Sequence, residues 1–125
     1  MSSIHLYRPV GSKELELIKA SNWQEFPPRL PEQPIFYPVL TYEYADLIIT
    51  NWNINEEFSG YVGYITKFEV DLEYIVKFKV EIAGGPQLQE LWVPSEELTE
   101  FNKHIVTKIK IVEVQYGKLF GGWQN

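Results

Sequence analysis

The fold of this chain is decided by a proline-rich segment at residues 26–39, which reads FPPRLPEQPIFYPV and holds five of the chain's eight prolines. Proline fixes the φ angle and has no backbone N–H to donate, so this segment can form neither a helix nor a central strand. Its aromatic and aliphatic residues favour burial, which an ordinary linker does not need. We therefore predict a stiff, packed loop that borders a site and holds Arg29, Glu32 and Gln33 at low entropic cost.

Regular patterns flank the proline-rich segment on both sides. Residues 4–9 alternate as a strand that places Leu6 and Arg8 on one face, and Ser12 is the candidate N-cap of a helix that follows. Residues 35–40 predict a short, irregular strand, because Pro38 interrupts it. Thr41 is the candidate N-cap of a second helix, and its predicted core face follows the i, i+3, i+4, i+7 pattern of Ala45, Ile48, Ile49 and Trp52.

The second half of the chain is richer in strands. Strands are expected at residues 60–70, 76–82, 88–93 and 105–114. Between them we expect a short turn or a single helical turn at 71–74, a turn at Gly84-Gly85-Pro86 and a short helix that starts at Pro94. In the strand at 76–82, the half-buried face would hold Val76, Phe78, Val80 and Ile82. The apolar pattern changes phase at Ile111-Val112, which predicts a bulge or burial on both faces.

This order of elements predicts an α+β fold rather than a doubly wound sheet. Strand, helix, loop, strand and helix come first, and a mostly antiparallel β-meander follows. A single domain should cover residues 1–116, because a chain of 125 residues is of ordinary size for one core. Residues 117–125 predict a weakly ordered C-terminal tail.

Composition excludes several classes of function. The chain has no cysteine, and its two histidines, His5 and His104, fall on different elements, so we expect no metal site. A formal net charge of −6 with scattered basic residues argues against nucleic-acid binding. The start lacks the features of a signal peptide and no apolar run is long enough for a bilayer, which predicts a cytoplasmic protein without membrane association. We expect a monomer or a weak homodimer.

Arg8 and Glu90 are the first two candidate functional residues. Arg8 ends a strand just before the chain turns, and its guanidinium could hold an anion or simply pair with a surface carboxylate. Glu90 shares a strand face with Leu88 and Trp92, so its carboxylate could be partly desolvated and suited to general-base or cation-stabilising work. The alternative for Glu90 is a solvated glutamate opposite a lysine of a neighbouring strand.

Aromatic residues make up 15% of the chain, more than a core of this size needs. They could form an aromatic-rich core, or they could line a cleft or partner surface. Tyr37, held between Phe36 and Pro38, could stack on a flat ligand or pack in the core. Arg29 and Gln33 of the proline-rich segment could line the same pocket.

Three stretches of the chain resemble a family of small bacterial proteins that carry the label "ADP-ribosylation/crystallin". They are residues 6–11 (LYRPVG), the proline-rich segment, and residues 90–94 (ELWVP); residues 101–106 (FNKHIV) also match. The resemblance covers nearly all of residues 6–116. The layout is similar to the ADP-ribosyltransferase fold, which has an arginine or histidine on the first strand, a serine or tyrosine on a middle strand and a late glutamate.

This resemblance implies a small domain that binds NAD or a related nucleotide, with NAD-dependent ADP-ribosyl transfer or NAD glycohydrolysis as its reaction. Arg8 would hold the phosphates or ribose, Tyr37 would stack on nicotinamide, and Glu90 would stabilise the developing oxocarbenium ion. Arg29, Gln33 and Trp92 would help to bind the cofactor. No metal is implied.

A second hypothesis is a non-enzymatic protein-binding or immunity-type protein, in which acidic charge speeds association and aromatic residues anchor the partner. The two hypotheses differ in where Tyr37, Trp92 and Trp23 point. Aromatic side chains that line a concave pocket beside Arg8 favour a nucleotide, whereas a flat exposed patch favours a protein partner.

Overall fold

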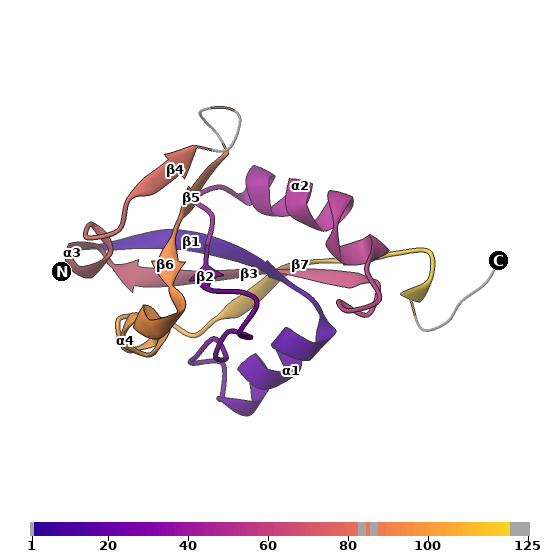
Figure 1. Ribbon diagram of the computed structural model, residues 1–125, viewed down its shortest axis with the longest axis horizontal. Helices are drawn as coiled ribbons and strands as arrows, with labels where there is room; N and C mark the ends of the chain where they lie inside the picture. The colour runs from indigo at the N-terminus through magenta and orange to yellow at the C-terminus, as the bar shows by residue number, and fades with distance from the viewer. Residues whose placement is uncertain (1, 83–84, 86–87, 121–125) are drawn as a thin grey trace.

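A three-stranded antiparallel sheet forms the centre of the molecule, with strands in the order β1-β3-β7 (Figure 1). The computed structural model describes residues 2–82, 85 and 88–120. The three strands are β1 (Ser3–Val10), β3 (Val62–Asp71) and β7 (Lys110–Tyr116). The chain combines helices with antiparallel strands in open sheets, so the predicted α+β class is confirmed.

Shorter elements surround this sheet. The helices are α1 (Ser12–Ala20), α2 (Tyr42–Asn51), α3 (Leu72–Ile75) and α4 (Leu98–Lys103), with 3-10 turns η1 (Asn53–Asn55) and η2 (Ser95–Glu97). The short strands are β2 (Ile35–Phe36), β4 (Val80–Ile82), β5 (Gln89–Leu91) and β6 (Val93–Pro94). Thr41 caps α2 as predicted, since its hydroxyl accepts a hydrogen bond from the Tyr44 N–H at 3.1 Å. Gly11, rather than Ser12, is the N-cap residue of α1.

The end of the proline-rich segment lies between β1 and β5. Val39 exchanges two backbone hydrogen bonds with Tyr7, at 2.8 and 2.9 Å, and forms a bridge to Glu90 on its other side. Residues 35–40 therefore run antiparallel to residues 89–94, with Ile35 opposite Pro94. Pro38 has no N–H to donate, so regular strand geometry is confined to β2, as the sequence predicted. This arrangement brings Glu90 to the neighbourhood of β1.

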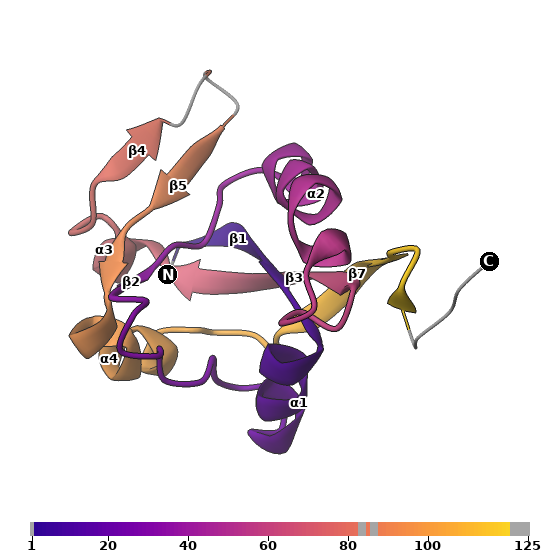
Figure 2. The ribbon, with the colours of Figure 1, turned by 45° about the vertical axis from the view of Figure 1, so that its right-hand side comes forward.

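Helices lie on both sides of the central sheet (Figure 2), and hydrophobic side chains are buried in two clusters. On one face lies α2, where Ala45 and Ile49 pack against Val39 and Ile65. On the other face lie α1, α4 and the proline-rich segment, and the centre of that core is four phenylalanine rings with neighbouring centroids 4.9–6.2 Å apart: Phe26, Phe36, Phe68 and Phe101. The proline-rich segment is thus anchored in the larger core by two of its own rings.

Asn102 fixes the start of the proline-rich segment from the far end of the sequence. Its amide accepts a hydrogen bond from the Phe26 N–H at 2.9 Å and donates one to the Phe26 carbonyl at 3.0 Å. Phe26 is 2% exposed, so water offers its backbone groups little alternative. One side chain on α4 therefore satisfies both polar groups of a buried residue in a segment that has few ladder bonds of its own.

Asn102→Ala is expected to lower the free energy of unfolding by about 2–3 kcal/mol, because two hydrogen bonds disappear and two buried backbone groups lose their partner. Asn102→Asp keeps the acceptor but loses the donor, so its effect should be about half as large. Urea unfolding of the three proteins measures this ranking. Ordinary surface substitutions change the free energy of unfolding by up to about 0.5 kcal/mol. An equally small change in Asn102→Ala would show that the two hydrogen bonds to Phe26 do not stabilise the segment.

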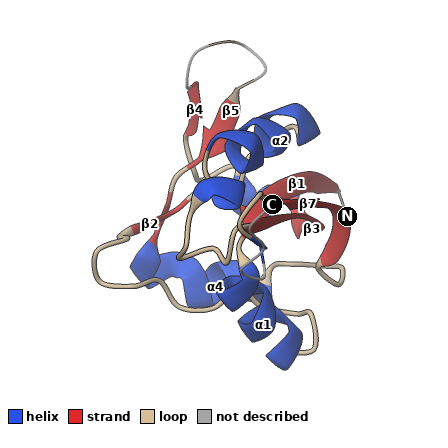
Figure 3. Cartoon of the chain, turned by 90° about the vertical axis from the view of Figure 1, so that its right-hand side faces the viewer, coloured by secondary structure: helices blue, strands red, loops and turns tan. Residues whose placement is uncertain are grey.

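Two predictions about the second half of the chain were wrong. The strands are antiparallel but do not form a meander, because both edges of β3 are occupied by β1 and β7 and β4 pairs with β5 instead. The strand predicted at residues 76–82 is shortened to β4, since Val76 closes α3 by donating its N–H to Leu72. The β4–β5 pair stands away from the central sheet (Figure 3), and Val80 and Ile82 of β4 are exposed. Val76, which follows α3, is exposed as well.

The predicted bulge near Ile111-Val112 is confirmed. Ile65 pairs with Glu113 and Thr66 pairs with Ile111, which leaves Val112 as the extra residue on β7. The strand predicted from residue 105 starts later, at Lys110, and Ile105 makes only an isolated bridge to Val70.

The chain continues past β7 along the loop at residue 61. The Gly117 N–H donates to the Tyr61 carbonyl at 2.8 Å, and the Phe120 ring packs edge-on against Tyr116. The rest of the predicted tail, residues 121–125, and most of the predicted turn at residues 84–86 lie outside the described residues. Within the described part of the chain, no helix has the length and apolar character that crossing a membrane requires.

Candidate functional site

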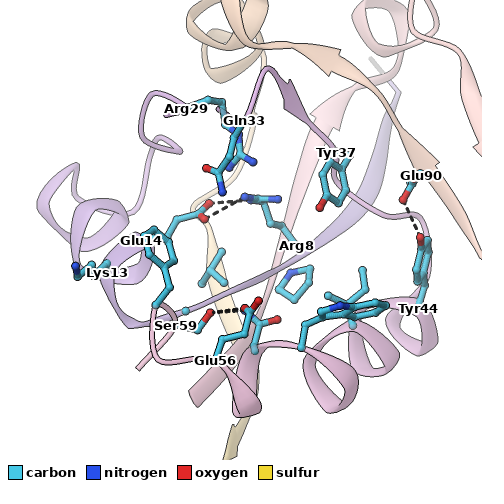
Figure 4. A pocket seen from close by; sticks show the side chains of 17 residues that line it. Arg8, Lys13, Glu14, Arg29, Gln33, Tyr37, Tyr44, Glu56, Ser59 and Glu90 are labelled. Atoms are coloured by element: carbon cyan, nitrogen blue, oxygen red, sulfur yellow. Dashed lines mark hydrogen bonds and ion pairs between the residues drawn. The ribbon is translucent and has the colours of Figure 1, made fainter. Parts of the chain in front are cut away.

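A pocket of about 450 Å³ opens where the end of β1, the start of α1, the proline-rich segment, α2 and β5 meet (Figure 4). This volume lies within the range of small-molecule sites. Five of the six residues singled out from the sequence line it, namely Arg8, Arg29, Gln33, Tyr37 and Glu90. The other lining residues are Pro9, Val10, Gly11, Lys13, Glu14, Tyr44, Ile48, Trp52, Asn53, Glu56, Phe58 and Ser59.

Arg8 lies at the base of this pocket, on the face of β1 that also carries Leu6 and Val10. Its Nε and Nη2 donate to the two carboxylate oxygens of Glu14 at 2.8 and 3.0 Å. Its Cζ lies 4.8 Å from the centre of the Phe36 ring, and Arg8 as a whole is 7% exposed. Arg8 is thus paired with a carboxylate, which was the alternative to anion binding in the sequence analysis. The partner, Glu14, belongs to the pocket wall and not to open surface.

Arg29 is the second guanidinium of the pocket and differs from Arg8 in its partners. Among the residues that the structure describes, its buried Nε–H has no hydrogen-bond acceptor. Burial, followed by the positive charge of Arg8, lowers the pKa of the Arg29 guanidinium, whereas Glu14 and Tyr37 act in the opposite direction. An arginine stays protonated despite such a shift, so the pocket contains a cation whose charge the fold compensates poorly.

Glu90 is held at the β5 side of the pocket by two neutral donors. One carboxylate oxygen accepts from the Tyr44 hydroxyl at 2.8 Å and the other from the Trp92 Nε1–H at 2.9 Å. Burial, and then the hydrogen bond to Glu90, raises the pKa of Tyr44 well above its ordinary value, so its hydroxyl stays a donor. The alternative for Glu90 was a solvated carboxylate opposite a lysine, and no lysine is among these contacts. The Tyr44 hydroxyl and the Trp92 Nε1–H orient the carboxylate instead.

The aromatic residues divide between the pocket and the core. Tyr37 lines the pocket and is 41% exposed, while its neighbour Phe36 is fully buried. Trp92 is not a lining residue and reaches the site only through its bond to Glu90. Trp23 packs against the larger core. The positions of Tyr37, Trp92 and Trp23 were expected to distinguish a nucleotide pocket from a flat surface for a protein partner. Of these three side chains, only Tyr37 lines the pocket.

Sequence reasoning missed several wall residues. Trp52 was assigned to the core by helical spacing, but it is 52% exposed and lines the pocket, because α2 ends at Asn51 and the chain turns there. Glu14 was assigned only to the first turn of α1, although its position six residues after Arg8, across the turn at Gly11, could have suggested the pair. Tyr44 carried no signal, since its partner is 46 residues away.

The wall opposite the proline-rich segment depends on a close contact at Gly11. The Ser12 N–H donates to the Ser59 carbonyl at 3.0 Å, and a Cβ on Gly11 would lie 2.6 Å from the Ser59 Cα. Only glycine allows this approach without displacing the loop. The loop is also held by the Ser59 hydroxyl, which donates to Glu56 at 3.2 Å.

No protein-family model matches the chain, and neither a curated protein nor a solved structure matches it. The family resemblance and the similarity to the ADP-ribosyltransferase fold therefore stay predictions. Within the described ranges, no three histidine or acidic side chains gather in a way that could hold a metal ion. The site is defined by its own chemistry, which combines guanidinium groups, an oriented carboxylate and exposed aromatic rings.

Proposed function

We propose that the pocket binds NAD or a related nucleotide and that the chain is a small ADP-ribosyltransferase-like domain. The observation that carries this proposal is the convergence of Arg8, Arg29, Gln33, Tyr37 and Glu90 in one pocket. These residues come from β1, the proline-rich segment and β5, and the sequence predicted each of them as a candidate site residue. Their charges and rings match the parts of a dinucleotide, which has phosphates, sugars and flat bases.

The reaction proposed for this pocket is cleavage of the bond between the ribose C1′ and the nicotinamide nitrogen. The bonding electron pair leaves with nicotinamide and neutralises its positive ring, while positive charge develops on the ribose. The Glu90 carboxylate, held by Tyr44 and Trp92, would stabilise that charge electrostatically. Water or another nucleophile then bonds to C1′ and loses a proton, which gives either hydrolysis or transfer.

Titration of NAD into the purified protein tests the proposal, with tryptophan fluorescence and free nicotinamide measured in the same tubes. Trp52, which lines the pocket, and Trp92, which contacts Glu90, should give saturable quenching. Quenching with nicotinamide release supports an active enzyme, and quenching without release supports a nucleotide-binding module. No response up to millimolar NAD would reject both. Trp23→Phe is the matched control, because Trp23 packs against the core and should not report binding.

A protein partner is the second candidate, and one observation favours it. Trp52 and Phe58 at the edge of the pocket are 52% and 60% exposed. Exposed aromatic side chains of this kind often anchor protein interfaces. An NAD titration that produces neither a fluorescence change nor free nicotinamide would favour a protein partner over a nucleotide ligand.

A further inference from the structure

We infer that the pocket contains a phosphate subsite whose principal contact is Arg29, and that Arg8 acts beside it as the fixed partner of Glu14. This inference deepens the proposed function, because it names the group of the nucleotide that binds at Arg29. It also departs from the expectation that Arg8 would be the phosphate clamp. The ligand chemistry is a phosphate group, either as part of a nucleotide or free.

An inventory of the charged groups in the pocket leads to this assignment. Its three carboxylates all have donors, since Glu14 binds Arg8, Glu56 accepts from the Ser59 hydroxyl, and Glu90 accepts from Tyr44 and Trp92. Among the three cations, Arg8 is bound by Glu14 through two hydrogen bonds, and the Lys13 Nζ lies over the Phe58 ring, 5.6 Å from its centre. One buried guanidinium donor is left over among the described residues, and it belongs to Arg29.

The position of Arg8 is already fixed, which limits its use as a clamp. The edge of its guanidinium formed by Nε and Nη2 is the one that could grip two oxygens of a phosphate, and Glu14 occupies that edge. A phosphate would have to displace a carboxylate that is only partly exposed. The Arg29 Nε–H has no acceptor among the described residues, so a phosphate that binds this guanidinium need not displace a hydrogen bond of that group.

The missing acceptor at the Arg29 Nε–H, within the part of the chain that the structure describes, is unfavourable for the fold. A buried donor without an acceptor has lost its water without a replacement, and the nearby charge of Arg8 adds repulsion. An anion bound between the two guanidinium groups would supply acceptors to Arg29 and would offset the repulsion. A buried donor without an acceptor, next to a like charge, is expected of a residue that binds a ligand and does not stabilise the fold.

The proline-rich segment presents Arg29 on a rigid support. Pro27 and Pro28 precede it and Pro31 follows, the Gln33 N–H donates to the Leu30 carbonyl at 2.8 Å, and Asn102 clamps the start of the segment. Figure 4 shows Arg29 and Gln33 directed toward the part of the pocket that holds Arg8. A preorganised donor loses less entropy when an anion binds.

Isothermal titration calorimetry with inorganic phosphate, pyrophosphate, ADP-ribose and NAD tests the subsite on the wild type and on Arg29→Gln. The substitution should weaken pyrophosphate and ADP-ribose binding about tenfold to a hundredfold, because a hydrogen bond to a charged group is lost. Arg29→Lys should restore only part of the affinity, since a lysine lacks the planar fork. The matched control is Lys19→Gln, which removes one positive charge from the exposed end of α1, outside the pocket, and should change affinity less than about threefold.

A second measurement separates ligand binding from a structural role. Without ligand, Arg29→Met should raise the melting temperature, because a buried N–H that has no acceptor among the described residues is removed. With pyrophosphate present, the wild type should gain thermal stability and Arg29→Met should not. An Arg29 that served only the fold would behave in the opposite way: its loss would lower the melting temperature and leave anion binding unchanged, which would overturn the inference.

The outcomes also distinguish this inference from the proposed function. If NAD binds and turns over through Glu90 but Arg29→Gln binds every probe like the wild type, the subsite is overturned and the proposed function stands. If pyrophosphate binds through Arg29 but NAD binds no better than pyrophosphate, the subsite stands and the dinucleotide assignment falls. Inorganic phosphate that binds as tightly as ADP-ribose would identify a free phosphate as the ligand.

Discussion

Glu90→Gln is expected to reduce nicotinamide release from NAD by about a hundredfold or more, the usual effect of removing one preorganised electrostatic group from a reacting site. Glutamine keeps the shape of the side chain but not the negative charge that would stabilise the developing cation. Its carbonyl oxygen can still accept from Tyr44 or Trp92, so the pocket should keep its form. Nucleotide binding, measured by fluorescence, should therefore stay within about threefold of the wild type, as expected for ground-state contacts left intact.

Tyr44→Phe is the matched control for Glu90→Gln. It removes one of the two donors that orient the carboxylate but leaves the charge in place, so nicotinamide release should fall by less than in Glu90→Gln. A Glu90→Gln protein that releases nicotinamide at the wild-type rate would end the role proposed for Glu90. Equal losses in both variants would instead identify orientation by Tyr44 as the decisive contribution.

The neighbours Phe36 and Tyr37 should separate stability from binding. Phe36 is fully buried and touches Phe26, Phe101 and the Arg8 guanidinium, so Phe36→Ala should lower the free energy of unfolding by about 3–5 kcal/mol. Tyr37 is partly exposed and lines the pocket, so Tyr37→Ala should change stability by less than about 1 kcal/mol. The nucleotide affinity of the Tyr37→Ala protein should nevertheless fall about tenfold, because a ring stacked on a base contributes about 1–3 kcal/mol of binding free energy.

Chemical denaturation and NAD titration of the same protein preparations test this contrast. Phe36→Leu, which retains more of the side-chain volume than alanine, should stay folded and bind the nucleotide close to wild-type affinity. Unchanged affinity in Tyr37→Ala would remove the stacking role proposed for Tyr37. A large loss of stability in that variant would place the ring in the core, which was the alternative interpretation of the sequence.

Local patterns were sufficient where the cause of structure is local. The Thr41 cap, the irregular strand at residues 35–40 and the bulge at Val112 were all predicted, because each depends on neighbours within a few residues or on the missing N–H of a proline. The alternation around Glu90 also holds, with Leu91 and Val93 buried. Arg8, Tyr37 and Glu90 line one pocket because the end of the proline-rich segment pairs with both β1 and β5.

The sequence by itself determined the α+β class, most of the element positions and five polar or aromatic residues that line the pocket. Only the tertiary structure decided that β3 lies between β1 and β7, that Trp52 lines the pocket, and that Glu14 pairs with Arg8. It also decided that the buried Arg29 Nε–H has no acceptor among the described residues. The physical reason is the distance along the sequence between the groups that interact. Caps, turns and periodicity arise from groups a few residues apart, whereas strand neighbours and ion pairs depend on distances between segments that only the packed core brings together.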